Sequence, residues 1–445
     1  MKLQLTILAL FLLVMVVAFA LVPPSATALV KPGRVTLPAA AVSPSAAISG
    51  CAIFPADNVW NTRIDTLPVH PRSNDYIATI GPTTGLHPDF GTVWLGAPIG
   101  IPYTTVPGTQ TPVTITFGYD DESDPGPYPI PSDAPIEGGP SSTGDRHVLV
   151  VDRGNCVLYE MFDAWPQAGG SWSAGSGAVY TLTSNALRPN GWTSADAAGL
   201  PILPGLVRYD EVAAGAINHA LRFTASRTQD AHVWPARHDA STSTDPARPP
   251  MGQRFRLKAS FDISGYPPEV QVILQALKTY GMILADNGSN WYISGVPDSR
   301  WDDDTLVSQL QKVKGSDFEA VDESGLMVDP DSGQVNGVRD LRVSQAVTTT
   351  NWLTATLRWT APVGAVTTTV RYTYTLITEG TWANTVILTN TLPGSTNVFT
   401  AGLPYAGGIV YFALKSQLTG GGWMALSNNA FWPHQDVYLP LILKP

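Results

Sequence analysis

The stretch 145–163 restricts the possible folds more than any other part of this chain. It contains two apolar, β-branched-rich runs on either side of the turn pair Arg153-Gly154. Alternating runs around a glycine-containing turn predict a β-hairpin. A two-residue loop at this turn would place His147 opposite Glu160, on one apolar face of the hairpin. An imidazole beside a carboxyl group at the end of a strand predicts an acid/base pair.

The composition favours short strands and turns over long helices. The 445 residues include 40 glycines, 38 prolines and 13 tryptophans, while only 14% of the residues are charged. Such a composition is typical of chains with many turns. We therefore expect a mainly β protein whose large domain is an antiparallel β-sandwich or jelly roll with one or two helices. Exposed tryptophans would suit flat ligands such as sugars.

The first residues predict export from the cell. Lys2 precedes an apolar run over 5–22, and 26–28 provide a small-residue cleavage site, so 1–28 is interpreted as a signal peptide. A retained membrane anchor is the alternative, because the run is near the lower limit of length for a span. No later segment approaches that length. We expect a secreted or cell-surface, extracellular protein with no membrane span after signal removal.

Charge and cysteine content restrict the partners further. The net charge of −10 and the lack of a basic stripe argue against a nucleic-acid partner. The two cysteines, Cys51 and Cys156, predict a disulfide in an exported chain, whereas a nucleophilic thiol is the alternative. Nothing in the sequence indicates an oligomeric state.

The chain divides into six predicted segments. They are the signal peptide 1–28, an Ala/Pro/Ser linker 29–50, a β-rich large domain 51–321, a second linker 322–337, a β-module 338–432 and an apolar tail 433–445. In the β-module, Leu353, Ala355 and Leu357 alternate with polar residues, and this alternation recurs along the module. Several such strands with turn signals between them predict a β-sandwich.

Two stretches of this module, 357–362 and 410–416, resemble a fibronectin type III domain. The resemblance covers about a quarter of the chain and implies an immunoglobulin-like β-sandwich that acts as a spacer or docking module. The corner tyrosine of that family falls on Val410 or Tyr411, depending on a one-residue shift. The large domain, through 51–62, 124–128 and 186–192, resembles a group of secreted bacterial proteins without an established activity.

Two helices are expected in the large domain. Residues 268–281 carry apolar residues at helical spacing between a proline and a glycine, and 305–314 form a shorter amphipathic pattern. Three aspartates at 302–304 suit the N-terminus of the second helix, and calcium binding there is the alternative. A second hairpin is expected around Asn287-Gly288.

Glu160 is the first candidate for a catalytic acid. It lies in the middle of an apolar strand, where loss of water would raise the pKa of its carboxyl group. A glycosidase needs a second carboxyl group, for which Asp210 or Glu211 are the first choice and Asp121 or Glu122 the second. The alternative is that Glu160 pairs with His147 or an arginine and only completes the core.

The remaining candidates concern substrate and metal binding. Trp165 and Trp192 are expected to stack on sugar rings, and Arg222 and His219 to contact substrate, although His219 shares its face with apolar residues as a structural histidine would. No spacing typical of a metal site occurs, so no metal ligands are assigned. The acidic loop that contains Asp121, Glu122 and Asp124 could bind calcium through these three side chains. The alternative is a solvated surface loop without a bound ion.

These observations favour a secreted polysaccharide-active enzyme, with a glycoside hydrolase as the preferred class, acting on a polysaccharide or cell-surface glycan. An extracellular carbohydrate-binding or adhesion protein is the alternative, and a polysaccharide lyase that uses Arg222 to neutralise a uronate is the third hypothesis. The enzyme hypothesis expects at least two carboxyl groups facing one groove lined by Trp or Tyr. The binding hypothesis expects Glu160 and His147 to be buried and fully paired, with no open cleft beside them.

Overall fold

A computed structural model describes residues 47–338, 341–362, 365–378, 380–418, 423–424 and 426–433. The predicted signal peptide, most of the first linker and nearly all of the predicted tail lie outside these residues. The described part is mainly β, with four α-helices, which confirms the predicted class. None of its helices is long and apolar enough to cross a membrane. Export and the remaining domain boundaries stay predictions.

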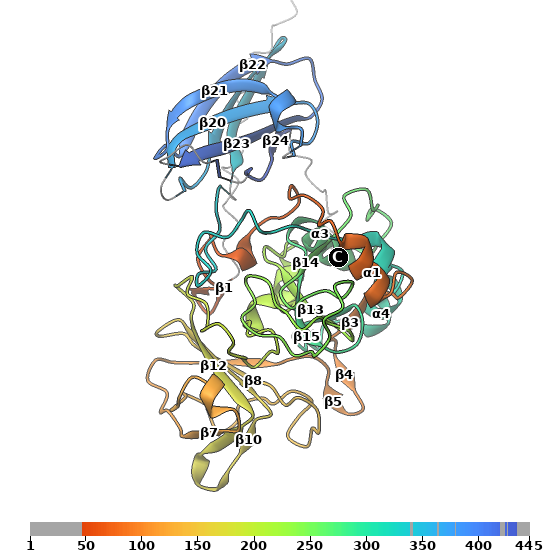
Figure 1. Cartoon of the computed structure of the whole chain (residues 1–445), viewed down its shortest axis with the longest axis vertical. Helices are drawn as coiled ribbons and strands as arrows, with labels where there is room; N and C mark the ends of the chain where they lie inside the picture. The colour runs from red at the N-terminus through yellow and green to blue at the C-terminus, as the bar shows by residue number, and fades with distance from the viewer. Residues whose placement is uncertain are drawn as a thin grey trace, which may run out of the picture. The chain divides into compact units, whose positions relative to one another are not determined.

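The C-terminal module consists of two antiparallel sheets (Figure 1). The first has the order β18 (Arg342–Thr349), β19 (Trp352–Arg358), β22 (Val398–Pro404). The second has the order β21 (Val386–Pro393), β20 (Ala365–Thr373), β23 (Val410–Leu418), β24 (Ala430–Trp432). The alternating residues Leu353, Ala355 and Leu357 are buried, and they share a core with Val370 and Phe412 of the second sheet. The module is therefore the expected immunoglobulin-like sandwich.

The large domain contains three main sheets and two short strand pairs. The largest sheet has the order β17 (Phe318–Ala320), β14 (Arg254–Leu257), β15 (Met282–Asn287), β13 (Leu221–Ala225), β16 (Tyr292–Ser294), β3 (His87–Asp89). The second has the order β12 (Ser176–Thr181), β9 (Val157–Phe162), β8 (Val148–Asp152), β6 (Tyr103–Val106). The third has the order β10 (Trp165–Pro166), β11 (Trp172–Ala174), β7 (Ile115–Phe117).

The short pairs are β1 (Ala47–Ile48) with β2 (Cys51–Ala52) and β4 (Val93–Trp94) with β5 (Ala97–Pro98). All three main sheets of the large domain also contain parallel pairs, which the alternation in the sequence did not indicate. These pairs are β13 with β15, β16 with β3, β6 with β8 and β11 with β7.

Four helices belong to the large domain: α1 (Ser73–Ile80), α2 (Tyr209–Ala213), α3 (Pro268–Thr279) and α4 (Asp303–Leu310). In Figure 1, α1, α3 and α4 lie against the six-stranded sheet. The predicted helices correspond to α3 and α4, whereas α1 and α2 were not expected. The side chain of Asp302 accepts a hydrogen bond from the N–H of Thr305, so Asp302 caps α4, as predicted.

The four-stranded sheet is buried on both faces. Leu149 and Leu158 belong to the main core of the large domain, whereas Val148 and Met161 belong to a second core on the opposite face. A strand covered on both sides is a continuous apolar run rather than an alternating one, as 148–151 is. Side chains of this sheet therefore point into a core on either face.

The hairpin between β8 and β9 has a different register from the predicted one. Leu149, not His147, lies opposite Glu160, because the loop spans 153–156 instead of two residues. The carboxylate of Asp152 accepts hydrogen bonds from the N–H groups of Gly154 and Asn155, which stabilises this longer turn. The prediction that His147 faces Glu160 is therefore wrong. A shift by two positions leaves each side chain on its predicted face.

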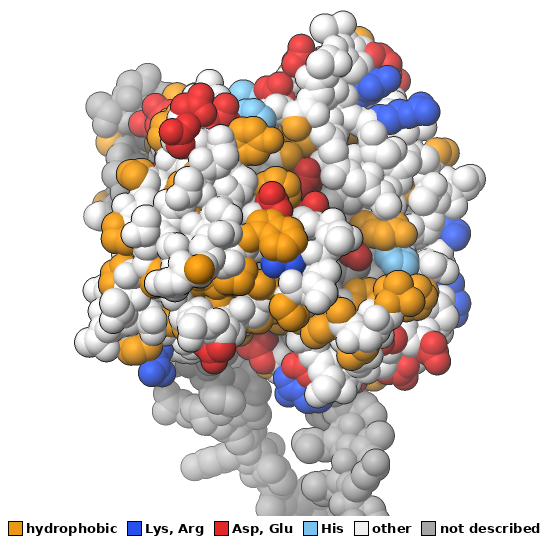
Figure 2. All heavy atoms as spheres, turned by 90° about the horizontal axis from the view of Figure 1, so that it is seen from below, with side chains coloured by type: hydrophobic (Ala, Val, Ile, Leu, Met, Phe, Trp, Pro, Cys, Tyr) orange, Lys and Arg blue, Asp and Glu red, His pale blue; other side chains and the backbone are white. Residues whose placement is uncertain are grey.

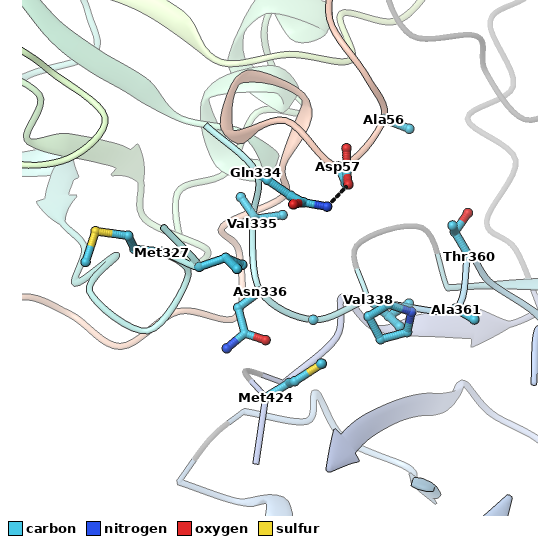
Figure 3. A pocket seen from close by; sticks show the side chains of 13 residues that line it. Ala56, Asp57, Met327, Gln334, Val335, Asn336, Val338, Thr360, Ala361 and Met424 are labelled. Carbon is cyan, nitrogen blue, oxygen red and sulfur yellow. Dashed lines mark hydrogen bonds between the residues drawn. The ribbon is translucent and has the colours of Figure 1, made fainter. Parts of the chain in front are cut away.

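The predicted disulfide between Cys51 and Cys156 is present and ties this loop to β2. At the other end of the large domain, the predicted linker 322–337 contributes Leu326 and Val335 to the main core. In this segment, Gln334 donates a 2.7 Å hydrogen bond to Asp57 (Figure 3). At least part of the segment is thus packed against the large domain.

Candidate functional site

A pocket of about 460 Å³ opens on the large domain. This volume lies in the range of sites for small ligands. Figure 2 shows acidic side chains recessed among apolar ones on the face that it presents. The lining includes four acidic residues, an aromatic pair and a histidine: Glu122, Asp145, Asp196, Asp286, Tyr119, Phe162 and His238. At least two carboxyl groups and a tyrosine thus share one pocket, as the enzyme hypothesis expects.

One wall of the pocket is built around a buried arginine. Arg222 lies on β13, and Asp286 lies near the end of the neighbouring parallel strand β15. The guanidinium of Arg222 donates two 2.8 Å hydrogen bonds to the two carboxylate oxygens of Asp196, and a third to Ser294. Its Nη2 atom lies 3.8 Å from Oδ2 of Asp286. The bidentate bond orients both the arginine and Asp196 rigidly.

Asp286 is the pocket carboxyl group with the most perturbed pKa. Burial is the main cause of the rise, and the adjacent carboxylate of Asp196 raises the pKa further, against the opposing effect of Arg222, to about 8. A neighbouring carboxyl group disfavours the ionised form of Asp286 in this way because like charges repel. The Asp286 side chain is 24% exposed, whereas that of Asp196 is 0% exposed. Asp286 therefore presents a protonated carboxyl group to the pocket at neutral pH.

A second polar group at the pocket consists of Glu137, Asp145 and His147. Nδ1 of His147 lies 2.6 Å from Oε2 of Glu137, and its Nε2 lies 2.9 Å from the carbonyl oxygen of Ala195. Burial lowers the pKa of His147, but the charge and hydrogen bond of Glu137 raise it more, to about 9. The imidazolium form can donate to both acceptors at once.

One ligand atom from each of Glu137, Asp145 and His147 lies within 4.8 Å of the others. His147 is buried, Glu137 is half-buried and Asp145 is exposed. One imidazole and two carboxylates are a group that could hold a metal ion. No metal ligands were expected from the sequence, because these three residues lie in loop segments before β8 without a spacing typical of a metal site.

Glu160, the predicted catalytic acid, lies in the core. It is 0% exposed, and its two oxygens accept hydrogen bonds from the backbone N–H groups of Ile202 and Leu203. Burial raises the pKa of Glu160 to about 7, although these hydrogen bonds oppose the rise. Glu160 does not line the pocket. This environment agrees with the alternative hypothesis that Glu160 is a structural residue of the core. Its partners are backbone N–H groups, however, and not His147 or an arginine.

The two carboxyl groups predicted as first choice for the second acid, Asp210 and Glu211, lie outside the pocket. Glu211, on α2, pairs with Nη2 of Arg208 at 2.8 Å and with Nε2 of His219 at 3.0 Å. The side chain of Asp210 is 60% exposed and lies 3.5 Å from Arg208. His219 is buried, and Nδ1 contacts the carbonyl oxygen of Ala220, so it is the structural histidine of the alternative interpretation. None of the candidates Asp210, Glu211 and His219 lines the pocket.

The predicted sugar-stacking tryptophans also lie outside the pocket lining. The guanidinium of Arg146 covers the ring of Trp165, 3.5 Å from its centroid, and the Trp165 N–H donates to Asp163. Trp192 lies beside Arg188, at 5.5 Å. Arg222, predicted to contact substrate, is instead held by Asp196.

The predicted calcium loop binds groups of the chain itself. Asp124 accepts hydrogen bonds from Arg188 and from the N–H of Val179, and Glu122 accepts one from the N–H of Thr193. Asp121 is exposed. Among the described residues, the group that could hold a metal contains none of Asp121, Glu122 and Asp124.

Of the four acidic residues that line the pocket, only Glu122 was a candidate site residue from the sequence. The sequence does contain an indication for Asp286, because this acid directly follows the apolar residues 282–285, which are buried, and precedes a predicted turn. An acid at the end of a buried strand is a candidate for a site at the edge of a sheet. Asp196 has no such signal, because it lies in an irregular segment.

No family model and no curated protein matches this chain. Among solved structures, pectate lyase Pel3 from Pectobacterium carotovorum is 17% identical, over 24% of this chain and 28% of its own, with a TM-score of 0.17. A Fn3-like protein from Clostridium thermocellum is 18% identical, over 21% of this chain and 84% of its own, with a TM-score of 0.16. The spore cortex lytic enzyme SleM from Clostridium perfringens is 13% identical, over 25% of this chain and 33% of its own, with a TM-score of 0.15.

The match with the pectate lyase thus spans less than a third of that protein's length. At these identities and TM-scores, the likenesses assign neither a family nor an activity to this chain.

Proposed function

We propose that the large domain is a secreted polysaccharide-active enzyme, a glycoside hydrolase in which Asp286 is the general acid. The observation that carries this proposal is a partly exposed carboxyl group that lines a pocket and whose pKa is raised by burial and by a neighbouring carboxyl group. A general acid needs a pKa near the working pH and access to the leaving group. Asp286 has both properties, whereas Glu160 has only the first.

Asp196 and Arg222 would act as positioning residues for Asp286. The bidentate bond to Arg222 fixes the side chain of Asp196 in place, and the proximity of Asp196 raises the pKa of Asp286. In the proposed reaction, Asp286 gives its proton to the glycosidic oxygen as the bond to the leaving sugar breaks. Asp196 then faces a newly ionised neighbour, which favours reprotonation of Asp286 from water.

The second carboxyl group of the reaction would be Glu122. It lines the same pocket, its side chain is 34% exposed, and it lies 3.9 Å from Nε2 of His238. As a base, it would activate a water molecule, and as a nucleophile, it would attack the sugar directly. The separation of the two carboxyl groups in the bound complex decides between inversion and retention.

The two other hypotheses find less support. The carbohydrate-binding hypothesis expects Glu160 and His147 to be buried and paired, as they are. It also expects no open cleft beside them, whereas Asp145 and Ala195, which lie next to His147, line the pocket. The lyase hypothesis needs Arg222 to be free for a uronate, and Asp196 already occupies its guanidinium. The pocket lining is also acidic, which would repel an anionic sugar.

The test is a screen of the mature protein against a panel of polysaccharides. New reducing ends would indicate hydrolysis, and absorbance of unsaturated products would indicate elimination. We expect Asp286→Asn to lower kcat by about 10²- to 10⁴-fold, the usual contribution of a general acid. The control is Asp210→Asn, at an exposed acid outside the pocket, which should leave kcat unchanged.

Hydrolysis in the wild type should also fall as pH rises through about 8, where Asp286 loses its proton. Unsaturated products would show that the protein is a lyase and not a hydrolase. Retention on an insoluble glycan without turnover would show that it binds carbohydrate without cleaving it. If the Asp286→Asn variant still hydrolyses the glycan at the wild-type rate, Asp286 is not the general acid.

A further inference from the structure

We propose that Glu137, Asp145 and His147 bind one divalent transition-metal ion, with the chemistry of Zn²⁺, at the wall of the pocket. The ligand atoms of the three residues already lie within 4.8 Å of one another. A bound ion would sit between them after small side-chain movements, since Zn²⁺ takes nitrogen and oxygen ligands at about 2.0–2.2 Å. Binding would displace the proton on Nδ1 of His147 into solvent.

The orientation of His147 is the second observation in favour of this site. Its Nε2 lies 2.9 Å from the carbonyl oxygen of Ala195, which directs Nδ1 towards Glu137. A metal-binding histidine usually donates its other N–H to a carbonyl or carboxylate in this way, and this bond fixes the ring and the tautomer. The ring is 2% exposed and packs near Phe162, so the nitrogen ligand is held in place before the ion arrives.

The exposure of the three residues leaves one side of the site open. Asp145 is exposed and lines the pocket, whereas His147 lies behind it in the core. Three protein ligands with an open position facing a pocket are typical of zinc sites that bind water or substrate. If the proposed glycosidase function holds, a sugar hydroxyl would take this position. The site itself does not depend on that function.

The charges around the site favour a cation. Asp89, on β3, is close enough for Glu137 and Asp145 to raise the pKa of its carboxyl group, after burial as the main cause. Arg222 is the nearby positive charge that opposes a cation, and Asp196 neutralises it through its bidentate bond. Asp286, the other acid of this wall, adds no charge while it keeps its proton.

The nitrogen ligand selects the kind of ion. Calcium and magnesium prefer sites made only of oxygen atoms, whereas imidazole suits zinc and its neighbours in the transition series. We therefore expect Zn²⁺ to bind and Ca²⁺ not to compete with it. This expectation also separates the site from the calcium loop predicted at Asp121, Glu122 and Asp124.

The test is isothermal titration calorimetry of the metal-free mature protein with ZnCl₂, repeated in excess CaCl₂. We expect one zinc ion per chain and no change with calcium. Asp145→Asn is the main variant, because this exposed residue can lose its charge without disturbing the core. Its affinity for zinc should fall by more than the roughly 10- to 100-fold that loss of an outer-shell partner causes. The control is Asp121→Asn, which should bind zinc as the wild type does.

X-ray absorption at the zinc edge supplies the second readout. A shell of nitrogen and oxygen atoms at about 2.0–2.1 Å, with the outer scattering of one imidazole, is expected for the wild type. An absent imidazole signal, an Asp145→Asn variant with unchanged affinity, or a lack of zinc binding would each overturn the site. Because neither readout involves turnover, a chain that binds zinc but cleaves no glycan would overturn only the proposed function. A chain that cleaves glycan without binding zinc would overturn only the site.

Discussion

Glu160 and Asp286 are two carboxyl groups of the same domain whose pKa burial raises, to about 7 and about 8. Glu160 is 0% exposed, and backbone N–H groups hold both of its oxygens. The side chain of Asp286 is 24% exposed and faces a pocket beside another carboxylate. A raised pKa reports loss of water in both cases. Only access to the pocket separates a group that can react from one that completes a core.

The positions of the two residues in their sheets explain this difference. Glu160 lies in β9, an inner strand of a sheet with a core on each face. Asp286 lies near the end of β15, where the strand leaves the main core. The end of a strand can combine the rigid placement of a sheet with an opening to solvent, and the middle of a covered strand cannot.

The largest expected effect is the loss of stability when Arg222, which holds Asp196 next to Asp286, is replaced. Arg222→Leu would remove the cationic partner of the fully buried Asp196 side chain. Removing one member of a buried ion pair costs about 3–5 kcal/mol. We expect the free energy of unfolding to fall by this amount in urea denaturation. Adding Asp196→Asn to Arg222→Leu should recover part of the loss, because it removes the unpaired charge. A loss below about 1 kcal/mol, the range of exposed ion pairs, would mean that solvent reaches Asp196.

A smaller effect is expected on the Glu160 side. Glu160→Gln replaces a group that accepts hydrogen bonds from Ile202 and Leu203 with one that has a single acceptor oxygen. We expect the free energy of unfolding to fall by about 1–3 kcal/mol, the cost of an unsatisfied buried donor. Both kcat and KM on the glycan substrate should stay at their wild-type values. If Glu160→Gln folds but has no activity, then Glu160, and not Asp286, is the general acid.

The pH dependence of stability should separate the two carboxyl groups. A carboxyl group with a raised pKa in the folded state stabilises the protein below its unfolded pKa, near 4, and loses this contribution as pH rises to the folded pKa. The stability difference between the wild type and Glu160→Gln should therefore fall with pH up to about 7. For Asp286→Asn, the fall should continue to about 8.

His147 affects this measurement in the wild type and in both variants. Its pKa is raised to about 9, so its contribution is complete below the unfolded pKa of about 6.5 and is lost as pH rises to about 9. Glu137, the main cause of the raised pKa of His147, is unchanged in both variants, so most of this loss cancels in the differences. The charge coupling of His147 to Glu160 and to Asp286 stays in them. Urea denaturation of the three proteins from pH 5 to pH 9 is the measurement. Identical curves for the two variants would show that Asp286 ionises in the same range as Glu160.

Local patterns in the sequence predicted local structure but not the site. Alternation predicted the C-terminal sandwich, helical spacing predicted α3 and α4, and the cysteine pair predicted the disulfide. The pocket depends instead on the parallel pairing of β13 with β15, which brings Arg222 and Asp286 together from segments far apart in the sequence. No local pattern encodes such a pairing. The error at His147 has a local cause, because a side-chain cap at Asp152 lengthened the turn.

The smallest expected effect tests whether the site extends beyond the pocket of Asp286. Trp165 is 40% exposed, but the guanidinium of Arg146 covers its ring, and its N–H is bound to Asp163. Trp165→Ala should therefore lower the free energy of unfolding by about 0.5–1 kcal/mol, the lower range for a cation–π pair, because the tryptophan of this pair is partly exposed. Its affinity for glycan, measured by retention on an insoluble polysaccharide, should stay within about twofold of the wild type, an energy difference below 0.5 kcal/mol. A tenfold loss would mean that Arg146 moves aside for sugar and that the glycan reaches from Asp286 to this tryptophan.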